Sequence, residues 1–193
     1  VARVLFGFGG ATLLADGSRG PSPLPPFTPT AKEALATING ATLTSALSAL
    51  AVHRSHRVLD AALDACAMTL AVSHADAGLL NDSLLRARGH AGGRAAADRM
   101  RRRLGTPGLG AHSADAFSLR AAPAVLGTAL DALRWVESTV TTELNGACDN
   151  PLWFADEGVV EGGNFHGAPV ALAMDTLRIA LTQVATQSER RTF

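Results

Sequence analysis

The 193-residue sequence contains no tyrosine, a single lysine (Lys32) and only two cysteines, Cys66 and Cys148. The absence of tyrosine excludes a phenol as a proton-transfer group within this chain. Two cysteines are too few for a disulfide framework, which favours a reducing, cytoplasmic location.

The sequence also lacks an excess of charge and a long apolar run. Seventeen Lys and Arg residues balance 17 Asp and Glu residues, whereas chains that bind nucleic acid or anionic membranes usually carry a basic excess. No apolar stretch approaches the roughly 18 residues that cross a bilayer. We therefore expect neither a nucleic-acid partner nor a membrane partner. The hydrophobic content of 47% is sufficient for a sizeable core.

The chain begins at Val1 rather than at methionine, and it stops at Phe193 inside a helical pattern. These ends suggest either a piece cut from a larger product or one subunit of a split protein.

The composition of the sequence changes near residue 30, from a proline-rich segment to helical patterns. Residues 1–30 are predicted to hold the end of a helix, a short extended segment and a proline-rich linker with Pro21, Pro23, Pro25, Pro26 and Pro29. Residues 31–193 are predicted to form a segment of a helical bundle. Thr30 can cap its first helix. The apolar residues of that helix, Leu35, Ile38, Leu47 and Leu50, fall largely on one face.

Two later segments repeat apolar residues every three or four positions. The first contains Leu126, Leu130, Leu133, Val136 and Val140, and the second contains Val170, Met174, Leu177, Leu181 and Val184. Such stripes need a partner helix, from this chain or from another subunit. Between the helices we expect a glycine-punctuated polar loop at 89–93, a solvated basic face at 99–103 and a further loop at 145–163. The predicted fold class is all-α, a long-helix bundle.

Generic metal and nucleophile patterns are weak. His53 and His56 are three residues apart, but no third ligand follows at a matching spacing, so no metal site is predicted. Cys148 lies in a polar segment without an adjoining histidine, which leaves a nucleophilic role open.

Two segments carry more specific chemistry. In residues 115–123, Arg120 immediately precedes the long apolar helix, where a guanidinium can hold a carboxylate through two hydrogen bonds. In residues 162–167, two glycines precede an amide, an aromatic ring and an imidazole.

These segments resemble the aromatic amino acid ammonia-lyases, the superfamily of histidine, phenylalanine and tyrosine ammonia-lyases. Residues 32–40 are similar to the family pattern K-E-G-L-A-L-x-N-G-T, and residues 88–92 are similar to R-P-H-P-G-Q. Further blocks match D-x-Y-S-L-R-C-x-P-Q at 115–123, E-I-N-S-x-T-D-N-P at 143–151, G-G-N-F-H-G at 162–167 and S-E-R-R at 188–191.

The resemblance implies a long-helix bundle that assembles as a tetramer with active sites shared between subunits. It implies removal of ammonia from an amino acid by an electrophilic methylidene-imidazolone (MIO) group, which forms from an internal Ala-Ser-Gly. Arg120 would then bind the substrate carboxylate. Asn39 would bind near that carboxylate and the MIO group, with Asn164 and Phe165 beside the substrate. Loop-bracing roles fall on Asn145, Asp149 and Asn150.

Several positions depart from the family pattern. No Ala-Ser-Gly occurs in the 193 residues, and Phe117 stands where the family has an active-site tyrosine. Ala114 and Ala124 stand where the family has glutamine, and Ala121 stands where it has cysteine. A phenyl ring keeps the shape of the site but transfers no proton. This chain alone should therefore not perform the lyase reaction.

Three hypotheses of function follow. In the first, the chain is a subunit of a split MIO-type lyase whose partner, a homologous or complementary subunit, supplies the MIO group for a small substrate with a carboxylate. In the second, the same scaffold isomerises, cyclises or dehydrates an unsaturated or acyl substrate, with His166 or Asp115 as acid/base beside Phe117. In the third, the chain is a non-catalytic structural or regulatory paralogue.

Overall fold

The computed structural model describes residues 5–7, 12–13, 17–20, 25–30, 32–105 and 116–192. Internal contacts divide the chain into two units. Unit 1 consists of Val1–Thr44 and Gly146–Gly167, and unit 2 consists of Ser45–Asn145 and Ala168–Phe193. Each unit is described by itself.

Unit 2 is built from helices, which confirms the all-α prediction. Its long helices are α3 (Thr42–Val72, beginning in the last residues of unit 1), α7 (Ala122–Asn145) and α8 (Ala168–Thr192). Shorter elements are the 3-10 helix Ala77–Leu80, α4 (Asp82–Arg88), α5 (Ala91–Leu104) and α6 (Phe117–Arg120). Among the described residues, none of these helices combines the length and apolar content needed to cross a membrane.

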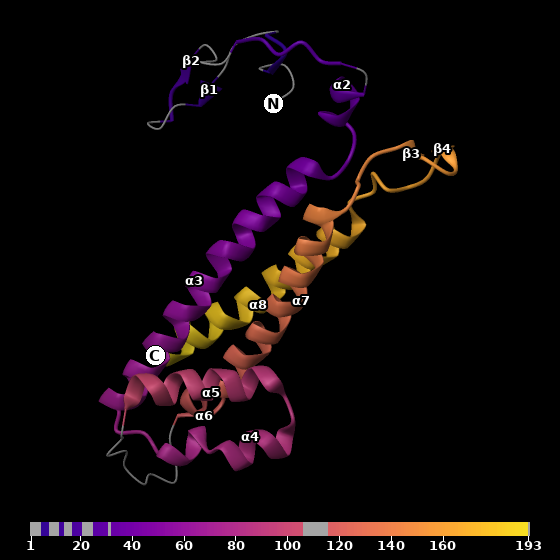
Figure 1. The fold of residues 1–193 in the computed structure, drawn as a ribbon. Helices are drawn as coiled ribbons and strands as arrows, with labels where there is room; N and C mark the ends of the chain where they lie inside the picture. Colours follow the sequence, from indigo (N-terminus) through magenta and orange to yellow (C-terminus); the bar gives the residue numbers. More distant parts are fainter. Residues whose placement is uncertain are drawn as a thin grey trace. The chain divides into compact units, whose positions relative to one another are not determined.

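The centre of unit 2 is the pairing of α7 with α8, which run side by side in Figure 1. Leu126, Leu133 and Val136 of α7 are almost fully buried, and Leu177 and Val184 of α8 lie in the same core. Both predicted stripes are therefore confirmed, and the partner of each lies within the chain. Each fully buried side chain of this kind contributes about 1.5–3 kcal/mol.

The apolar face that the sequence indicates on α3 is not the face that the core buries. Leu47 and Leu50 are 58% and 55% exposed, whereas Ser45, Ser48 and Val52 are buried. The helix also starts at Thr42 instead of near Thr30, because the chain turns at Gly40 with φ +111°. The first half of α3 thus has an apolar stripe and a serine-rich stripe, and the core of unit 2 takes the serine-rich one.

Gly92 and Gly93, predicted to lie in a loop, are in the first turn of α5 instead. A Cβ atom on Gly92 would overlap the carbonyl oxygen of Gly127 in α7, and one on Gly127 would overlap the backbone of Gly93. The side chain of Asp131 in α7 completes the contact, since its Oδ2 accepts a hydrogen bond from the Gly92 N–H at 3.0 Å. The glycines therefore mark a crossing of two helix backbones.

The basic run on α5 is less solvated than predicted. Arg99 is 27% exposed at its side chain and pairs with Asp60 and Asp64 of α3. Arg103 donates two hydrogen bonds to Asp64, at 2.9 and 2.8 Å, and they hold the pKa of that carboxyl below its ordinary value. These pairs connect α5 to α3.

Unit 1 contains short elements. The antiparallel pair β1 (Thr12–Leu13) and β2 (Arg19–Gly20) agrees with an extended N-terminal segment, and α2 (Glu33–Ala36) follows. Strands β3 (Leu152–Phe154) and β4 (Gly158–Val160) form a hairpin in the segment predicted to be a loop, with Leu152 opposite Val160. The division at residue 30 stays a prediction.

The helix crossing yields a matched pair of substitutions. Gly92→Ala should lower the free energy of unfolding by about 3 kcal/mol or more, because the new methyl group meets backbone atoms that cannot move without separating α5 from α7. Gly93→Ala, one residue along, meets nothing nearer than 3.6 Å and should be neutral or slightly stabilising. Denaturant unfolding measures both, and equal effects would contradict the crossing.

Candidate functional site

The predicted substrate-binding arginine lies on α6, a single helical turn in unit 2. Leu119 anchors this turn because it is 6% exposed, and Gln187 of α8 donates a buried hydrogen bond to the carbonyl oxygen of Ser118. The remaining two residues face outward: Phe117 is 79% exposed, and Arg120 is also exposed. The core therefore holds the backbone of α6 and leaves the phenyl ring and the guanidinium free to meet another molecule.

The guanidinium of Arg120 has no hydrogen bond or ion pair with any residue that the structure describes. Most other arginines of unit 2 form an ion pair with an acidic residue. Arg86 pairs with Asp82 at 3.0 Å, and Arg134 pairs with Asp131 at 2.7 Å. An unpaired guanidinium can donate hydrogen bonds to both oxygens of a carboxylate ligand.

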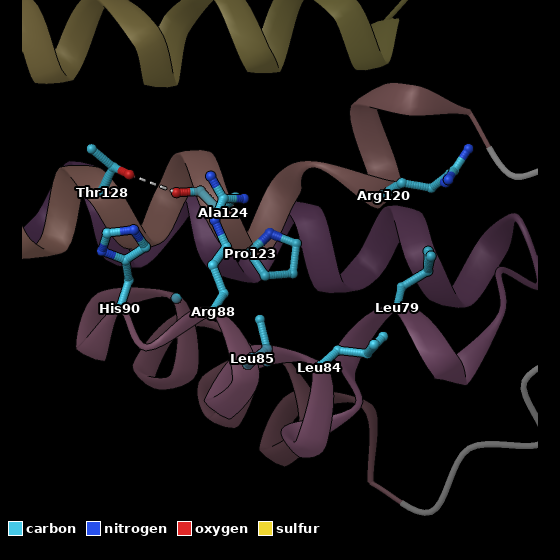
Figure 2. Close-up of a pocket in the computed structure, with 10 residues that line it drawn as sticks. Leu79, Leu84, Leu85, Arg88, His90, Arg120, Pro123, Ala124 and Thr128 are labelled. Atoms are coloured by element: carbon cyan, nitrogen blue, oxygen red, sulfur yellow. Dashed lines mark hydrogen bonds between the residues drawn. The ribbon is translucent and has the colours of Figure 1, made fainter.

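A cavity of about 220 Å³ lies between α4, α5 and the start of α7, and Arg120 lines one end of it. Among the described residues of the lining, Arg88 and His90 are the other basic ones, and none is acidic. Figure 2 shows Arg88 directed toward Ala124 of α7, whereas Arg120 lies at the opposite end and extends away from Arg88. Arg88 was not singled out as a site residue, although it opens the block at 88–92.

In unit 1 the segment that contains Asn39 packs against the segment after α7. Gly40 approaches so closely that a Cβ atom there would lie 2.6 Å from the carbonyl oxygen of Cys148. Lys32 forms an ion pair with Asp149 at 2.7 Å and donates a hydrogen bond to the carbonyl oxygen of Pro151. The single lysine of the sequence thus joins two segments that are more than a hundred residues apart, and sequence reasoning did not identify it.

The predicted loop-bracing residues fall into two groups. Asn150 closes the base of the hairpin, because its Oδ1 accepts a hydrogen bond from the Gly162 N–H at 2.6 Å. Asp149 accepts a hydrogen bond from the Asn150 N–H at 2.7 Å. Asn145, the last residue of α7, instead donates its side-chain amide to Thr141 of the same helix at 2.7 Å.

The 162–167 loop presents the other predicted residues. Asn164 donates to the carbonyl oxygen of Ala147 at 3.4 Å, and Phe165 is 40% exposed. His166 is exposed, and its backbone N–H donates to Gly163 at 2.9 Å. The side-chain carboxamide of the half-buried Asn39 has no hydrogen bond with any described residue.

Electrostatics single out Asp149. The hydrogen bond from Lys32, followed by that from the Asn150 amide, holds the pKa of this carboxyl below its ordinary 3.8. The carboxylate is therefore ionised at neutral pH and keeps the two segments of unit 1 together.

The predicted residues are thus distributed over both units. Unit 1 brings Asn39, Asp149, Asn150 and the 162–167 loop into one set of contacting segments, while unit 2 holds Phe117, Arg120 and Asn145. Asp115 and Ala114 lie outside the described residues. Nowhere in the described ranges do three or more His, Cys, Asp or Glu side chains gather as a metal site would require.

Comparison with known proteins identifies the family. The family model for aromatic amino acid lyases matches residues 8–193. A histidine ammonia-lyase from Gloeobacter violaceus is 42% identical over 191 residues, which are 95% of this chain and 37% of that protein.

Solved structures give the same result. Histidine ammonia-lyase from Trypanosoma cruzi has a TM-score of 0.84 and 38% identity, over 98% of this chain and 38% of that one. Tyrosine aminomutase from Streptomyces globisporus has a TM-score of 0.87 and 30% identity, over 98% of this chain and 42% of that one.

The chain thus spans about two fifths of the length of these relatives or less, and the family model covers nearly all of it. The chain belongs to the aromatic amino acid lyase family.

Proposed function

We propose that this chain is one subunit of a split MIO-type ammonia-lyase-like enzyme. It contributes the substrate-binding arginine and the site loops, and a partner chain contributes the MIO electrophile. The observation that carries the proposal is the unpaired guanidinium of Arg120 on a core-anchored turn. Family membership supports the assignment of this role to Arg120.

Arg120 has the chemistry to hold the carboxylate of an amino acid. Its planar guanidinium donates two parallel hydrogen bonds, which fix orientation as well as supply charge. Because Leu119 and Gln187 hold the turn from behind, the backbone of Arg120 does not have to be ordered when substrate binds.

The residues of unit 1 fit the neighbourhood of an MIO group by their donor chemistry. MIO supplies an electrophile for the removal of ammonia. The half-buried carboxamide of Asn39 can both donate and accept hydrogen bonds, and it has no partner among the described residues. Phe165 adds a partly exposed apolar ring, and His166 is the titratable side chain of its loop and the candidate acid/base.

Phe117 favours a second candidate function. An exposed phenyl ring at the position of the family tyrosine cannot move a proton, which suits chemistry other than ammonia release, such as isomerisation, cyclisation or dehydration of an unsaturated or acyl substrate. One structural relative is named a tyrosine aminomutase.

Purification tests the split arrangement. The chain, isolated at native expression level, should elute with a second polypeptide that contains Ala-Ser-Gly, and native mass spectrometry should give the mass of a mixed assembly. A monodisperse chain with no such companion would contradict the proposal.

Substitution of Arg120 tests its role within that assembly. Arg120→Gln should lower kcat/KM for the amino acid about 10- to 150-fold, the equivalent of one charge-assisted hydrogen-bonded contact of about 1.5–3 kcal/mol. Arg102→Gln, which changes an exposed arginine of α5, should leave it unchanged. If the wild-type assembly releases no ammonia but converts an acyl substrate, the second candidate replaces the first.

The pair of Lys32 and Asp149 gives a pH prediction for the loop brace. The pKa of Asp149 is lowered in the folded chain. The ion pair therefore contributes to stability at pH values above 3.8, and this contribution is lost as the pH falls through the lowered pKa. Carbon-13 titration should place the midpoint of Asp149 below 3.8. Lys32→Met should return the titration midpoint of Asp149 toward that value, and Lys32→Arg should leave it low. An unchanged midpoint in Lys32→Met would contradict the role of this ion pair.

A further inference from the structure

The cavity beside α4 has an unbalanced positive charge at the end opposite Arg120. Acidic side chains of α4 and α7, two helices that flank the cavity, are already engaged. Asp82 pairs with Arg86 at 3.0 Å and with Arg94 at 3.3 Å. Asp131 of α7 pairs with Arg134 and accepts the Gly92 N–H. The guanidinium of Arg88 has no hydrogen bond or ion pair with any residue that the structure describes.

Arg88 is placed to serve the cavity. It is the last residue of α4, and Gly89 follows in the left-handed conformation with φ +86°, which turns the chain into α5. In Figure 2 its side chain rises from α4 toward Ala124 and Thr128 of α7, with His90 nearby and Pro123 on its other side. The guanidinium therefore lies along the wall of the cavity.

The rest of the lining is mostly apolar. Leu84 and Leu85 of α4 form one side with Pro123 of α7 on the other. The Thr128 hydroxyl already donates to Ala124 at 2.9 Å, which leaves its oxygen without a proton to offer an anion. The cavity volume of about 220 Å³ is below the 300–1,000 Å³ of drug-sized sites, so it suits a small molecule.

The described lining contains cations without an acidic partner and no carboxylate. Apolar walls around such cations concentrate positive potential. The chemistry of the cavity matches an anion that has an apolar body, because the guanidinium binds both oxygens of a carboxylate and the leucines cover the hydrocarbon part. A free inorganic anion would use the charge but none of the apolar wall.

We propose that this cavity is a binding site for a small apolar carboxylate held by Arg88, distinct from the carboxylate site of Arg120. Arg88 rises toward Ala124, whereas Arg120 lies farther along the lining and extends away from Arg88 (Figure 2), so we expect one small carboxylate to engage Arg88 alone. The proposal does not depend on the lyase function.

Titration of the full chain with 3-phenylpropionate tests the site. Calorimetry and amide chemical shifts should show saturable binding that perturbs His90 and Thr128. Arg88→Gln should weaken the affinity at least tenfold and by clearly more than Arg120→Gln does, while Arg102→Gln should change it less than twofold. The neutral 3-phenylpropionamide should bind at least tenfold more weakly than the acid.

A second variant keeps the test independent of Arg88 and of the folding of α4. Ala124→Leu places bulk in the cavity without removing charge, and it should abolish binding while the free energy of unfolding stays near that of the wild type. Inorganic phosphate should bind at least tenfold more weakly than 3-phenylpropionate.

Three results would overturn the proposal. The first is the absence of saturable binding, and the second is phosphate binding as tight as that of the carboxylate. The third is a loss of affinity in Arg120→Gln equal to that in Arg88→Gln, which would make this cavity part of the substrate site. Because no reaction is measured, such a failure would leave the split-enzyme proposal standing, and failure of that proposal would leave this one standing.

Discussion

The backbone contact between α5 and α7 at Gly92 and Gly127 is the constraint on which the candidate sites of unit 2 depend. It brings the first turn of α5 against the start of α7, which is also where α6 ends. Arg88 and His90 precede α5, and Arg120 precedes α7. Without the glycines the helices would separate by the thickness of a side chain, and the cavity lined by these three basic residues would lose its walls.

Charge in this chain is balanced overall and unbalanced locally. Arg99 and Arg103 are neutralised by aspartates of α3, where the pairs connect two helices. Arg88 and Arg120 have no such neighbour in the described structure, since Asp82 and Asp131 serve other donors. Exposed pairs of this kind add little stability. Their effect here is to decide which guanidinium groups remain available for a ligand.

Unit 1 depends on the same combination of close backbone approach and charge. Gly40 lets the Asn39 segment lie against Cys148, and Lys32 fixes that contact through Asp149. The family motifs at 32–40 and at 143–151 are therefore largely one structural unit. Gly40 has φ +111° and Lys32 has φ +69°, and both bend the chain where the two segments meet.

The sequence by itself determined the family, the helical class and the two stripes that pair α7 with α8, because a period of three and four residues fixes which side chains share a helix face. The motif blocks also identified Arg120, Asn39 and the 162–167 loop as candidates. Periodicity did not decide which face of α3 is buried. Leu47 and Leu50 define one face and Ser48 and Val52 define another, and the core buries the second. It could not distinguish a glycine that ends a helix, such as Gly89, from one that admits a neighbouring helix, such as Gly92. Both choices rest on contacts between segments far apart in the sequence, and only the tertiary structure supplies those contacts.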